Sequence, residues 1–457
     1  MASSSGAAPT AHESTPSNPL APRRTPFGIR RARGVFWLLF AINALNYLDR
    51  LIAVAVSPTL KTQFHLNDSD IGLLGSAFLL VYTLTALPAG ALADRLGARA
   101  KVIAVGVTIW SIFSGLTAFV RGFRGLFVTR ALVGVGEASY SPAGVALLVN
   151  YFPPHRRAGI IGRWQAAQVV GSLLAFIIAG LLYLWLPAHT AWRVAFVLSA
   201  LPGLALAALA WRVADHPEGH PLARPPLPEE QTQPRASFSE EARTLWRQTT
   251  QTLSIPMIWI VVALQAVIYI VITPSVTFLP IYVRSENGPF HLNAAHASFA
   301  LGLTLIVGGV LGTILGGALS DWLNRRLPGG RVLAMTIGFA VAIPCYVAML
   351  LSHSLTLFLV TGTATTLALN LPGAALTATP QDVAPPRLRA TAIAVTMLLS
   401  HLLGDIWASW AVGALAIRLH DQLAQALLTI GIPALIFGAI VSLLGAKVYA
   451  RRHATLT

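Results

Sequence analysis

Charged residues are scarce in this sequence, and cysteine is nearly absent. Asp, Glu, Lys and Arg make up 11% of its 457 residues, against about 25% in a typical soluble domain, which argues against an ordinary soluble enzyme. The single cysteine, Cys345, excludes an intramolecular disulfide framework and a cysteine-based metal site. The sequence also lacks an ATPase motif and clustered histidine ligands, so we expect no metal and no cofactor, only the proton as a coupling ion.

Acidic residues are scarcer than basic ones, which leaves a formal net charge of +15. In a soluble chain this excess would suggest a nucleic-acid partner. The basic residues form no stripe on a soluble segment, however, and the apolar residues, 55% of the chain, fall in long blocks. Since about 20 apolar residues span a bilayer as a helix, we expect an integral membrane protein that binds no nucleic acid.

Twelve such blocks predict an all-α, polytopic membrane protein with twelve transmembrane helices. Their expected bounds are 35–60, 70–93, 101–120, 125–150, 158–184, 191–212, 256–283, 295–319, 331–351, 355–379, 389–417 and 422–449. We expect two six-helix bundles, at 34–213 and 255–450, with a disordered N-terminal tail at 1–33 and a C-terminal tail at 451–457. The connection at 214–254 is expected to be cytoplasmic, with an amphipathic helix over 239–252 that lies on the membrane surface.

Two segments of the first half recur in the second. Gly90-Ala-Leu-Ala-Asp94-Arg95-Leu96 follows the second predicted helix, and Gly317-Ala-Leu-Ser-Asp321-Trp322-Leu323 follows the eighth. A Pro-Pro pair followed by arginines precedes both the fifth and the eleventh helix. Parallel repeats of six helices are a known transporter plan, in which the substrate site lies between the halves near the membrane midplane.

The basic residues also predict the orientation. If the N-terminus is cytoplasmic, 24 of the 32 Lys and Arg residues lie on the cytoplasmic side, six lie outside and two lie within the membrane. Because positive residues gather on the cytoplasmic side of membrane proteins, we expect both termini in the cytoplasm. The expected location is a bacterial plasma membrane, and the expected state is a monomer surrounded by membrane lipids.

Several motifs resemble those of the major facilitator superfamily, over essentially the whole chain. Between the second and third helices, the chain resembles the superfamily signature at Gly90, Asp94, Arg95, Gly97 and Arg99. In the fourth helix, it resembles a second signature at Arg130, Gly134 and Gly136. Three strings resemble the Spinster lipid-transporter family within it: Asn46-Tyr47-Leu48-Asp49-Arg50, Gly136-Glu137-Ala138-Ser139-Tyr140-Ser141 and His401-Leu402-Leu403-Gly404-Asp405. The chain then departs from that family, with Ala408-Ser409-Trp410 in place of its usual Ser-Pro. The resemblance implies two pseudo-symmetric bundles around a central cavity and a lysophospholipid or sphingolipid-like substrate.

Five ionisable residues lie inside the predicted spans: Asp49, Arg50, Arg130, Glu137 and Asp405. An ionised side chain at the centre of a membrane helix costs at least about 2.5–3.5 kcal/mol. A functional role is therefore favoured, and a structural ion pair is the alternative. Burial favours a neutral carboxyl and a nearby cation favours an ionised one, so Asp49 and Glu137 could compete for Arg130 and release or take up a proton. The resemblance also assigns proton coupling to Asp49, Arg50, Arg130 and Glu137.

The first helix carries a polar stripe. Asn43, Asn46, Tyr47 and Arg50 recur every three or four residues, which places them on one face. We expect this face to bind the substrate, with Arg50 on an anionic head group. His401 and Asp405, four residues apart on the eleventh helix, can hydrogen-bond; a buried pair with no transport role is the alternative to a place in the cavity. The resemblance adds Glu137 and Tyr140 to the expected substrate site.

The loop motifs predict a conformational latch. Asp94, flanked by Gly90, Arg95 and Arg99, is expected to be attracted to the positive N-terminus of the eleventh helix. Such a contact forms only when the two halves approach each other on the inner side. Asp321 is the counterpart of Asp94 in the second half, and a solvated loop charge is the alternative for both.

Together these features predict a proton-coupled secondary transporter that moves an amphipathic, anionic, lipid-like substrate by alternating access. A transporter of organic anions or drugs and a uniporter are the open alternatives. A membrane-embedded lipid enzyme, the alternative from another class, would need a nucleophile–base set or metal ligands at one membrane depth. The sequence offers no Gly-x-Ser-x-Gly and no His-x-x-x-His cluster, so we expect no catalytic residues and no enzymatic activity.

Overall fold

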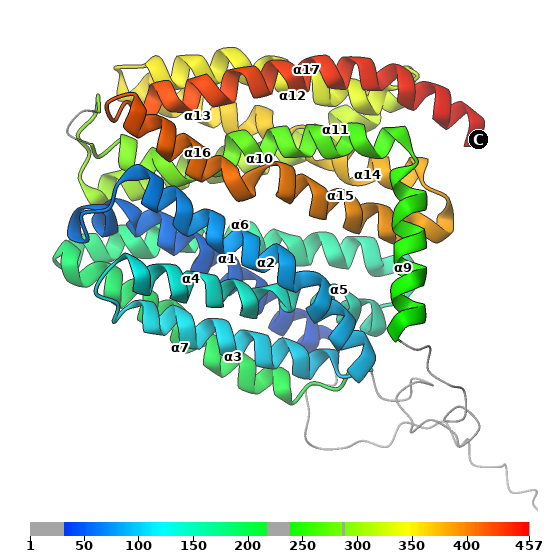
Figure 1. The fold of residues 1–457 in the computed structure, drawn as a ribbon, viewed down its shortest axis with the longest axis horizontal. Helices are drawn as coiled ribbons and strands as arrows, with labels where there is room; N and C mark the ends of the chain where they lie inside the picture. Colours follow the sequence, from blue (N-terminus) through cyan, green and yellow to red (C-terminus); the bar gives the residue numbers. More distant parts are fainter. Residues whose placement is uncertain (1–31, 217–237, 286–287, 457) are drawn as a thin grey trace, which may run out of the picture.

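The computed structural model describes residues 32–216, 238–285 and 288–456. Across these ranges the chain is helical with no strand, and twelve helical segments are long and apolar enough to cross a membrane. The prediction of twelve spans is confirmed. They run roughly side by side along the horizontal direction of Figure 1, where the first half of the chain lies below the second.

Each half contributes six spans, and some spans consist of two helices. The first half contains α1 (Ala32–Gln63), α2 (Asp68–Leu96), α3 (Arg99–Thr117), α4 (Phe123–Ala138), α5 (Tyr140–Tyr151), α6 (Pro154–Trp185) and α7 (Ala188–Trp211). The second half contains α10 (Pro256–Tyr282), α11 (Ala294–Arg326), α12 (Gly330–Leu351), α13 (Leu355–Asn370), α14 (Gly373–Val383), the 3-10 turn η2 (Pro386–Leu388), α15 (Arg389–Leu403), α16 (Asp405–Arg418) and α17 (Leu423–Leu456).

Three spans that the sequence predicts as continuous helices are interrupted. The span predicted at 125–150 breaks at Ser139, the one at 355–379 breaks at Leu371 and Pro372, and the one at 389–417 breaks at Gly404. Proline cannot donate a backbone hydrogen bond to the residue four positions earlier, which explains the break at Pro372 and, through Pro142, the one after Ala138. Gly404 itself has non-helical backbone angles, φ −106° and ψ −96°.

A further helix, α9 (Phe238–Leu253), precedes the second half. It is found where the sequence predicts an amphipathic helix, and it runs across the helix ends on the right of Figure 1, perpendicular to the spans. We call this the α9 end of the bundle. The predicted N-terminal tail and most of the predicted linker fall in 1–31 and 217–237, outside the described residues.

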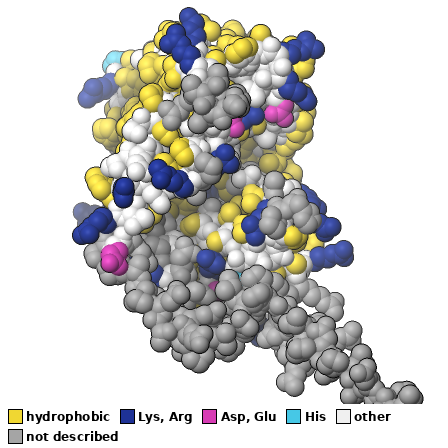
Figure 2. Space-filling view, turned by 90° about the vertical axis from the view of Figure 1, so that its right-hand side faces the viewer, with side chains coloured by type: hydrophobic (Ala, Val, Ile, Leu, Met, Phe, Trp, Pro, Cys, Tyr) yellow, Lys and Arg dark blue, Asp and Glu magenta, His cyan; other side chains and the backbone are white. Residues whose placement is uncertain are grey.

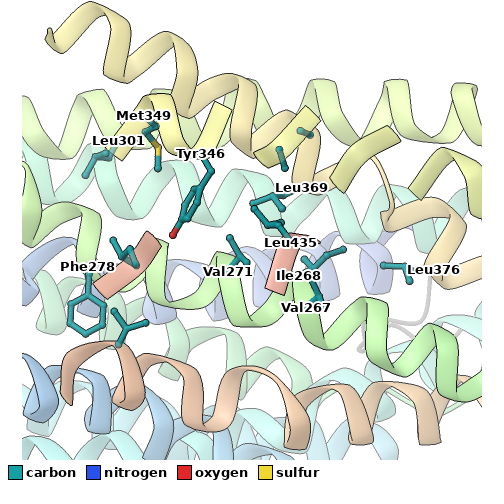
Figure 3. Close-up of a cluster of buried hydrophobic side chains, with 14 of the residues drawn as sticks. Val267, Ile268, Val271, Phe278, Leu301, Tyr346, Met349, Leu369, Leu376 and Leu435 are labelled. Carbon is teal, nitrogen blue, oxygen red and sulfur yellow. The ribbon is translucent and has the colours of Figure 1, made fainter. Parts of the chain in front are cut away.

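The surface and the interior of the bundle are both rich in apolar side chains. Large hydrophobic residues such as Leu84, Leu184 and Ile314 are more than 60% exposed, as expected where a helix faces lipid. Inside the second half, buried side chains of α10, α11, α12, α13 and α17 form one cluster. Figure 3 shows Tyr346 and Met349 of α12 beside Leu301 of α11 in this cluster. The interior thus forms a packed scaffold around the space between the halves.

The two halves contact each other closely at the end of the bundle opposite α9. A side chain added at Gly72 of α2 would overlap the Ser409 carbonyl of α16, and one added at Gly413 would overlap the Asp68 carbonyl. The halves also meet between α6 and α11, where Gly180 of α6 packs against Phe299 of α11. Glycine allows this backbone approach because it has no Cβ.

Toward the α9 end, the corresponding positions on α6 are open. A side chain added at Gly159 or Gly162 would have no described atom within 4 Å.

Arg284, which follows α10, adds a polar contact between the halves at the end opposite α9. Its Nη1 lies 3.4 Å from the Thr59 hydroxyl of α1. The space between the halves is therefore closed at that end by contacts between α1, α2, α6, α11 and α16.

Candidate functional site

Asp49 of α1 is held by three side chains from three other helices. Its Oδ2 lies 3.3 Å from Nη2 of Arg130 on α4. Its Oδ1 accepts hydrogen bonds from Ser114 of α3 and from Ser199 of α7, the latter at 2.8 Å. The side chain is only 1% exposed. Both carboxylate oxygens therefore have partners, which offsets much of the cost of burying the charge.

Glu137 of α4 is paired less completely. Its Oε2 lies 2.6 Å from Nε of Arg50 on α1, and its side chain is fully buried. Its second oxygen, Oε1, has no hydrogen-bond partner in the described part of the chain. Between Asp49 and Glu137, Glu137 is the one with a carboxylate oxygen that lacks a partner.

Aromatic rings surround the Arg50 guanidinium. The guanidinium carbon lies 4.5 Å from the ring centre of Tyr82, 5.2 Å from that of Phe78 and 5.3 Å from that of Tyr47. Cation–π contacts of this kind stabilise a cation where water is scarce. Unlike Glu137, the Arg50 side chain is 20% exposed. Arg50 thus connects a fully buried acid with accessible space.

The two acids do not share Arg130, as the sequence suggests they could. Asp49 and Arg50 are consecutive, so their side chains leave α1 about 100° apart. Arg130 and Glu137 are seven residues apart, about 10.5 Å along α4. Each acid therefore meets a different arginine, and two separate ion pairs form instead of one shared cation.

A cavity of about 380 Å³ lies between the two halves, next to Arg50. Its lining comes from α1 and α6 of the first half and from α10, α11, α12 and α13 of the second. Tyr47 and Arg50 are the residues of the predicted stripe that line it. Most of the wall is apolar, so the cavity is suited to a molecule with a substantial apolar part.

Polar side chains are spread along a mostly apolar cavity wall. Phe176 of α6, Leu301 of α11 and Met349 of α12 line it toward the closed end. Gln168, eight residues and about 12 Å closer to the α9 end along α6, lines it together with Asn370 of α13. The amide nitrogen of Asn370 donates to Thr366 O at 2.8 Å.

The sequence did not single out Gln168 or Asn370. Each is one polar residue in an apolar span, and such residues are common at helix–helix contacts. Gln168 and Ser172 are four residues apart, as are Thr366 and Asn370, so each pair lies on one face of its helix. This spacing is the sequence signal for these positions, and all four residues line the cavity.

Several predicted substrate residues lie away from the cavity wall. Asn43 is buried and donates to Trp164 O at 3.0 Å. Asn46 is 3% exposed, and Glu137 lies behind Arg50. Tyr140 is buried, donates to Leu39 O and accepts from Trp164 Nε1 at 2.8 Å. The α1 stripe turns from the cavity into the packing of the first half, because α6 covers its beginning. A role of these residues in substrate binding stays a prediction.

His401 and Asp405 form the predicted pair but do not line the cavity. Nδ1 of His401 lies 3.0 Å from both carboxylate oxygens of Asp405. The Tyr269 ring of α10 stacks on His401, with ring centres 4.5 Å apart and an interplanar angle of 10°. The pair bridges the break at Gly404 and holds α15, α16 and α10 together.

The predicted latch residues lie at the α9 end. Gly90 packs against Pro142 of α5, and Gly97, with φ +57°, makes the left-handed turn that ends α2. The backbone N–H of Arg99 donates to Asp215 at 2.6 Å, and Arg95 and Asp321 are exposed. The Asp94 side chain lies outside the part of the chain that the structure describes, so its predicted contact stays a prediction.

Sequence comparison assigns the family. A sequence profile of the Major Facilitator Superfamily matches residues 39–409. The chain belongs to the Major Facilitator Superfamily. It is 29% identical to Protein spinster of Drosophila melanogaster over 387 residues, a match that covers 83% of this chain and 61% of the Drosophila protein. It is also 27% identical to the hexuronate transporter of Bacillus subtilis over 299 residues, covering 65% of this chain and 67% of that one.

Among solved structures, the fold is similar to a bacterial homologue of the human lysosomal transporter Spinster, in an inward-facing and unoccupied conformation. The TM-score is 0.73 at 23% identity, and the similarity covers 93% of this chain and 97% of that one. The expected fold of two six-helix bundles is confirmed. Members of the superfamily are transporters of small molecules, which places this chain among transporters.

Proposed function

We propose that the protein is a proton-coupled transporter of an amphipathic anion, such as a lysophospholipid or a sphingolipid-like molecule. The proposal rests on the position of Arg50, which is paired with the buried Glu137 and also lines the apolar cavity. An anionic head group in the cavity can accept hydrogen bonds from Arg50. When Arg50 turns to the substrate, Glu137 loses its cation and binds a proton instead.

The polarity of the cavity supports an amphipathic substrate. Gln168 and Asn370 provide amide groups at the end near α9, and the walls near Phe176 and Met349 provide apolar surface. A head group would lie against Arg50 in the same cavity as these amide groups, and an apolar chain along the apolar walls. The similarity to Spinster proteins favours the same class of substrate.

The charge distribution supports a cytoplasmic position for the α9 end. In Figure 2, which looks onto that end, Lys and Arg side chains are spread over the surface and Asp and Glu are few. Positive residues mark the cytoplasmic side of a membrane protein. With both termini in the cytoplasm of a bacterial cell, the cavity would be closed toward the outside, and transport would require the opposite closure.

The experiment is counterflow in proteoliposomes preloaded with lysophosphatidylglycerol, with the labelled lipid added outside. We expect labelled lipid to accumulate with the wild type and with Arg418→Gln, which changes an exposed arginine. Accumulation should fall at least tenfold with Arg50→Gln. Equal accumulation by Arg50→Gln would contradict the assignment of Arg50 to the substrate.

Transport of a hydrophilic organic anion is the second candidate, supported by the similarity to the hexuronate transporter. Competition in the same assay separates the two. Excess lysophospholipid should abolish accumulation of the labelled lipid, and excess glucuronate should leave it unchanged. Competition by glucuronate would favour the organic-anion alternative.

A further inference from the structure

Hydroxyl groups are concentrated on the part of the cavity wall that the second half contributes. The lining residues there that carry a hydroxyl group come from α10, α11, α12 and α13: Ser275, Thr304, Thr313, Tyr346, Thr365 and Thr366. Among the described lining residues of the first half, only Tyr47 and Ser172 carry one. In a mostly apolar wall, the hydroxyl oxygens of the second half are polar groups that a bound molecule can reach.

The hydrogens of these hydroxyl groups are already used inside the protein. Thr304 donates to Ala300 O at 2.9 Å, and Thr365 donates to Thr361 O at 2.8 Å. Ser275, Thr313 and Thr366 likewise donate to the carbonyl four residues earlier on their own helices. Because a hydroxyl group has one hydrogen and two lone pairs, each of these side chains presents only acceptors to the cavity.

The hydroxyl hydrogen of Tyr346 is used in a similar way. Its oxygen lies 3.0 Å from that of Ser275, and Figure 3 shows the Tyr346 ring pointing from α12 toward α10. The hydrogen of Ser275 goes to Val271 O at 2.6 Å, so the hydrogen between the two hydroxyl groups belongs to Tyr346. The phenolic oxygen of Tyr346 is therefore an acceptor as well.

The first half contributes the strong donor of the cavity. The Arg50 guanidinium is the only charged group among the described lining residues, and the Gln168 amide lies on the same side. In the second half, Asn370 adds one free N–H, because its other amide hydrogen goes to Thr366 O at 2.8 Å. Since no Asp or Glu is among these lining residues, a cationic group of a ligand would find no counter-charge. The acceptors of the second half thus suit neutral donors.

We propose that the second-half wall is a subsite for neutral hydroxyl groups on the head group of the substrate. Arg50 binds the anionic group, and oxygens such as those of Thr304 and Thr365 accept hydrogen bonds from the hydroxyl groups. A ligand hydroxyl adds these bonds while the internal ones are kept, whereas a ligand acceptor could be bound only by breaking an internal bond. The inference rests on the proposed function and narrows its substrate class to amphipathic anions with a hydroxylated head group.

The test compares two lipids of the same charge and acyl chain as competitors in the counterflow assay. Lysophosphatidylglycerol carries hydroxyl groups on its head group, and lysophosphatidylmethanol carries a methyl group in their place. Each should reduce accumulation of labelled lysophosphatidylglycerol by the wild type. Because hydrogen bonds are lost, the half-inhibiting concentration of lysophosphatidylmethanol should be about 3- to 10-fold higher than that of lysophosphatidylglycerol.

A double variant locates this preference in the second-half wall. Thr304→Val combined with Thr365→Val keeps the shape of both side chains and removes both oxygens. The half-inhibiting concentration of lysophosphatidylglycerol should rise to that of lysophosphatidylmethanol, which should itself stay unchanged. Thr363→Val is the matched control and should keep the wild-type ratio. Thr363 also donates to its own helix, to Leu359 O at 2.8 Å, but does not line the cavity.

The possible failures are distinguishable. Equal inhibition of the wild type by the two lipids, or stronger inhibition by lysophosphatidylmethanol, would overturn the inference and leave the proposed function in place. A wild-type ratio in the double variant would also overturn it, as would an equal rise for both lipids, which indicates a packing role for the threonines. If the wild type accumulates no labelled lysophosphatidylglycerol, the proposed function itself is contradicted and the inference fails with it.

Discussion

Arg50 and Glu137 form an ion pair, Nε to Oε2 at 2.6 Å, that joins the wall of the cavity to the interior of the first half. Glu137 has no exposed side-chain surface, whereas Arg50 is partly exposed and lines the cavity. A ligand can therefore reach Glu137 only by displacing Arg50. In the mechanism that we propose, Arg50 takes part in both substrate binding and protonation of Glu137.

Glu137→Gln should separate exchange from uphill transport. The amide keeps a hydrogen-bond acceptor for Arg50 but cannot take up a proton, so pH-gradient-driven accumulation of lysophosphatidylglycerol should fall to the level of empty liposomes. Counterflow should persist within about threefold, because exchange moves no net proton. Asp421→Asn, which changes an exposed acid, is the matched control. Uphill transport by Glu137→Gln at the wild-type rate would mean that the proton binds elsewhere.

The serines around Asp49 should contribute to stability. Removing a hydrogen bond to a buried charge costs about 1.5–3 kcal/mol, so Ser114→Ala and Ser199→Ala should each lower the midpoint of thermal unfolding in detergent, measured by tryptophan fluorescence. Ser111→Ala on the same helix is the control, because the Ser111 hydroxyl is buried with no partner among the described residues. A Ser114→Ala midpoint equal to that of Ser111→Ala would show that Asp49 does not depend on these bonds.

The closed end should open when the glycine contact is removed. A Cβ at Gly72 would overlap backbone atoms of α16, whereas one at Gly75 meets no described atom within 4 Å. Gly72→Ala should therefore lengthen the distance between spin labels at the closed ends of α2 and α16, and Gly75→Ala should leave it unchanged. Identical distance distributions in the two variants would show that this contact does not set the conformation.

Gln168 should contribute to recognition of the head group. Gln168→Leu keeps the size of the side chain and removes one hydrogen-bonding group, worth about 0.5–1.5 kcal/mol. The half-saturating lysophosphatidylglycerol concentration should rise about 2- to 10-fold, with little change in the maximal rate. Val170→Leu, at the neighbouring exposed position outside the cavity lining, serves as the control. An unchanged half-saturating concentration would remove Gln168 from the head-group site.

The sequence predicted the spans and the buried charges well, because both depend on what a bilayer tolerates. A run of 20 apolar residues or an ionised residue inside it is visible without any tertiary information. Asp49, Arg50, Arg130 and Glu137 do form two ion pairs, although which acid meets which arginine depends on how α1 and α4 are rotated. Periodicity within one helix does not contain that rotation.

The cavity was harder to predict, because its lining also depends on how neighbouring helices pack against one another. Asn43 and Arg50 share a face of α1, but α6 covers the first and leaves the second open, a difference decided by a neighbouring helix. Gln168 and Asn370 come from opposite halves, so only the assembled fold brings them to one space. The interruptions at Ser139 and Gly404 were also missed, since the apolar pattern continues across them.

The most direct test of the account is to measure the proton that moves with the substrate. Proteoliposomes loaded with a pH-sensitive dye, with no initial pH gradient, receive lysophosphatidylglycerol on one side. The wild type should show a pH change inside that starts with substrate addition and disappears with a protonophore. The Asp49→Asn, Glu137→Gln double variant should bind the lipid and produce no pH change. Substrate transport by the wild type without proton movement, or an equal pH change with the double variant, would contradict proton coupling through these two acids.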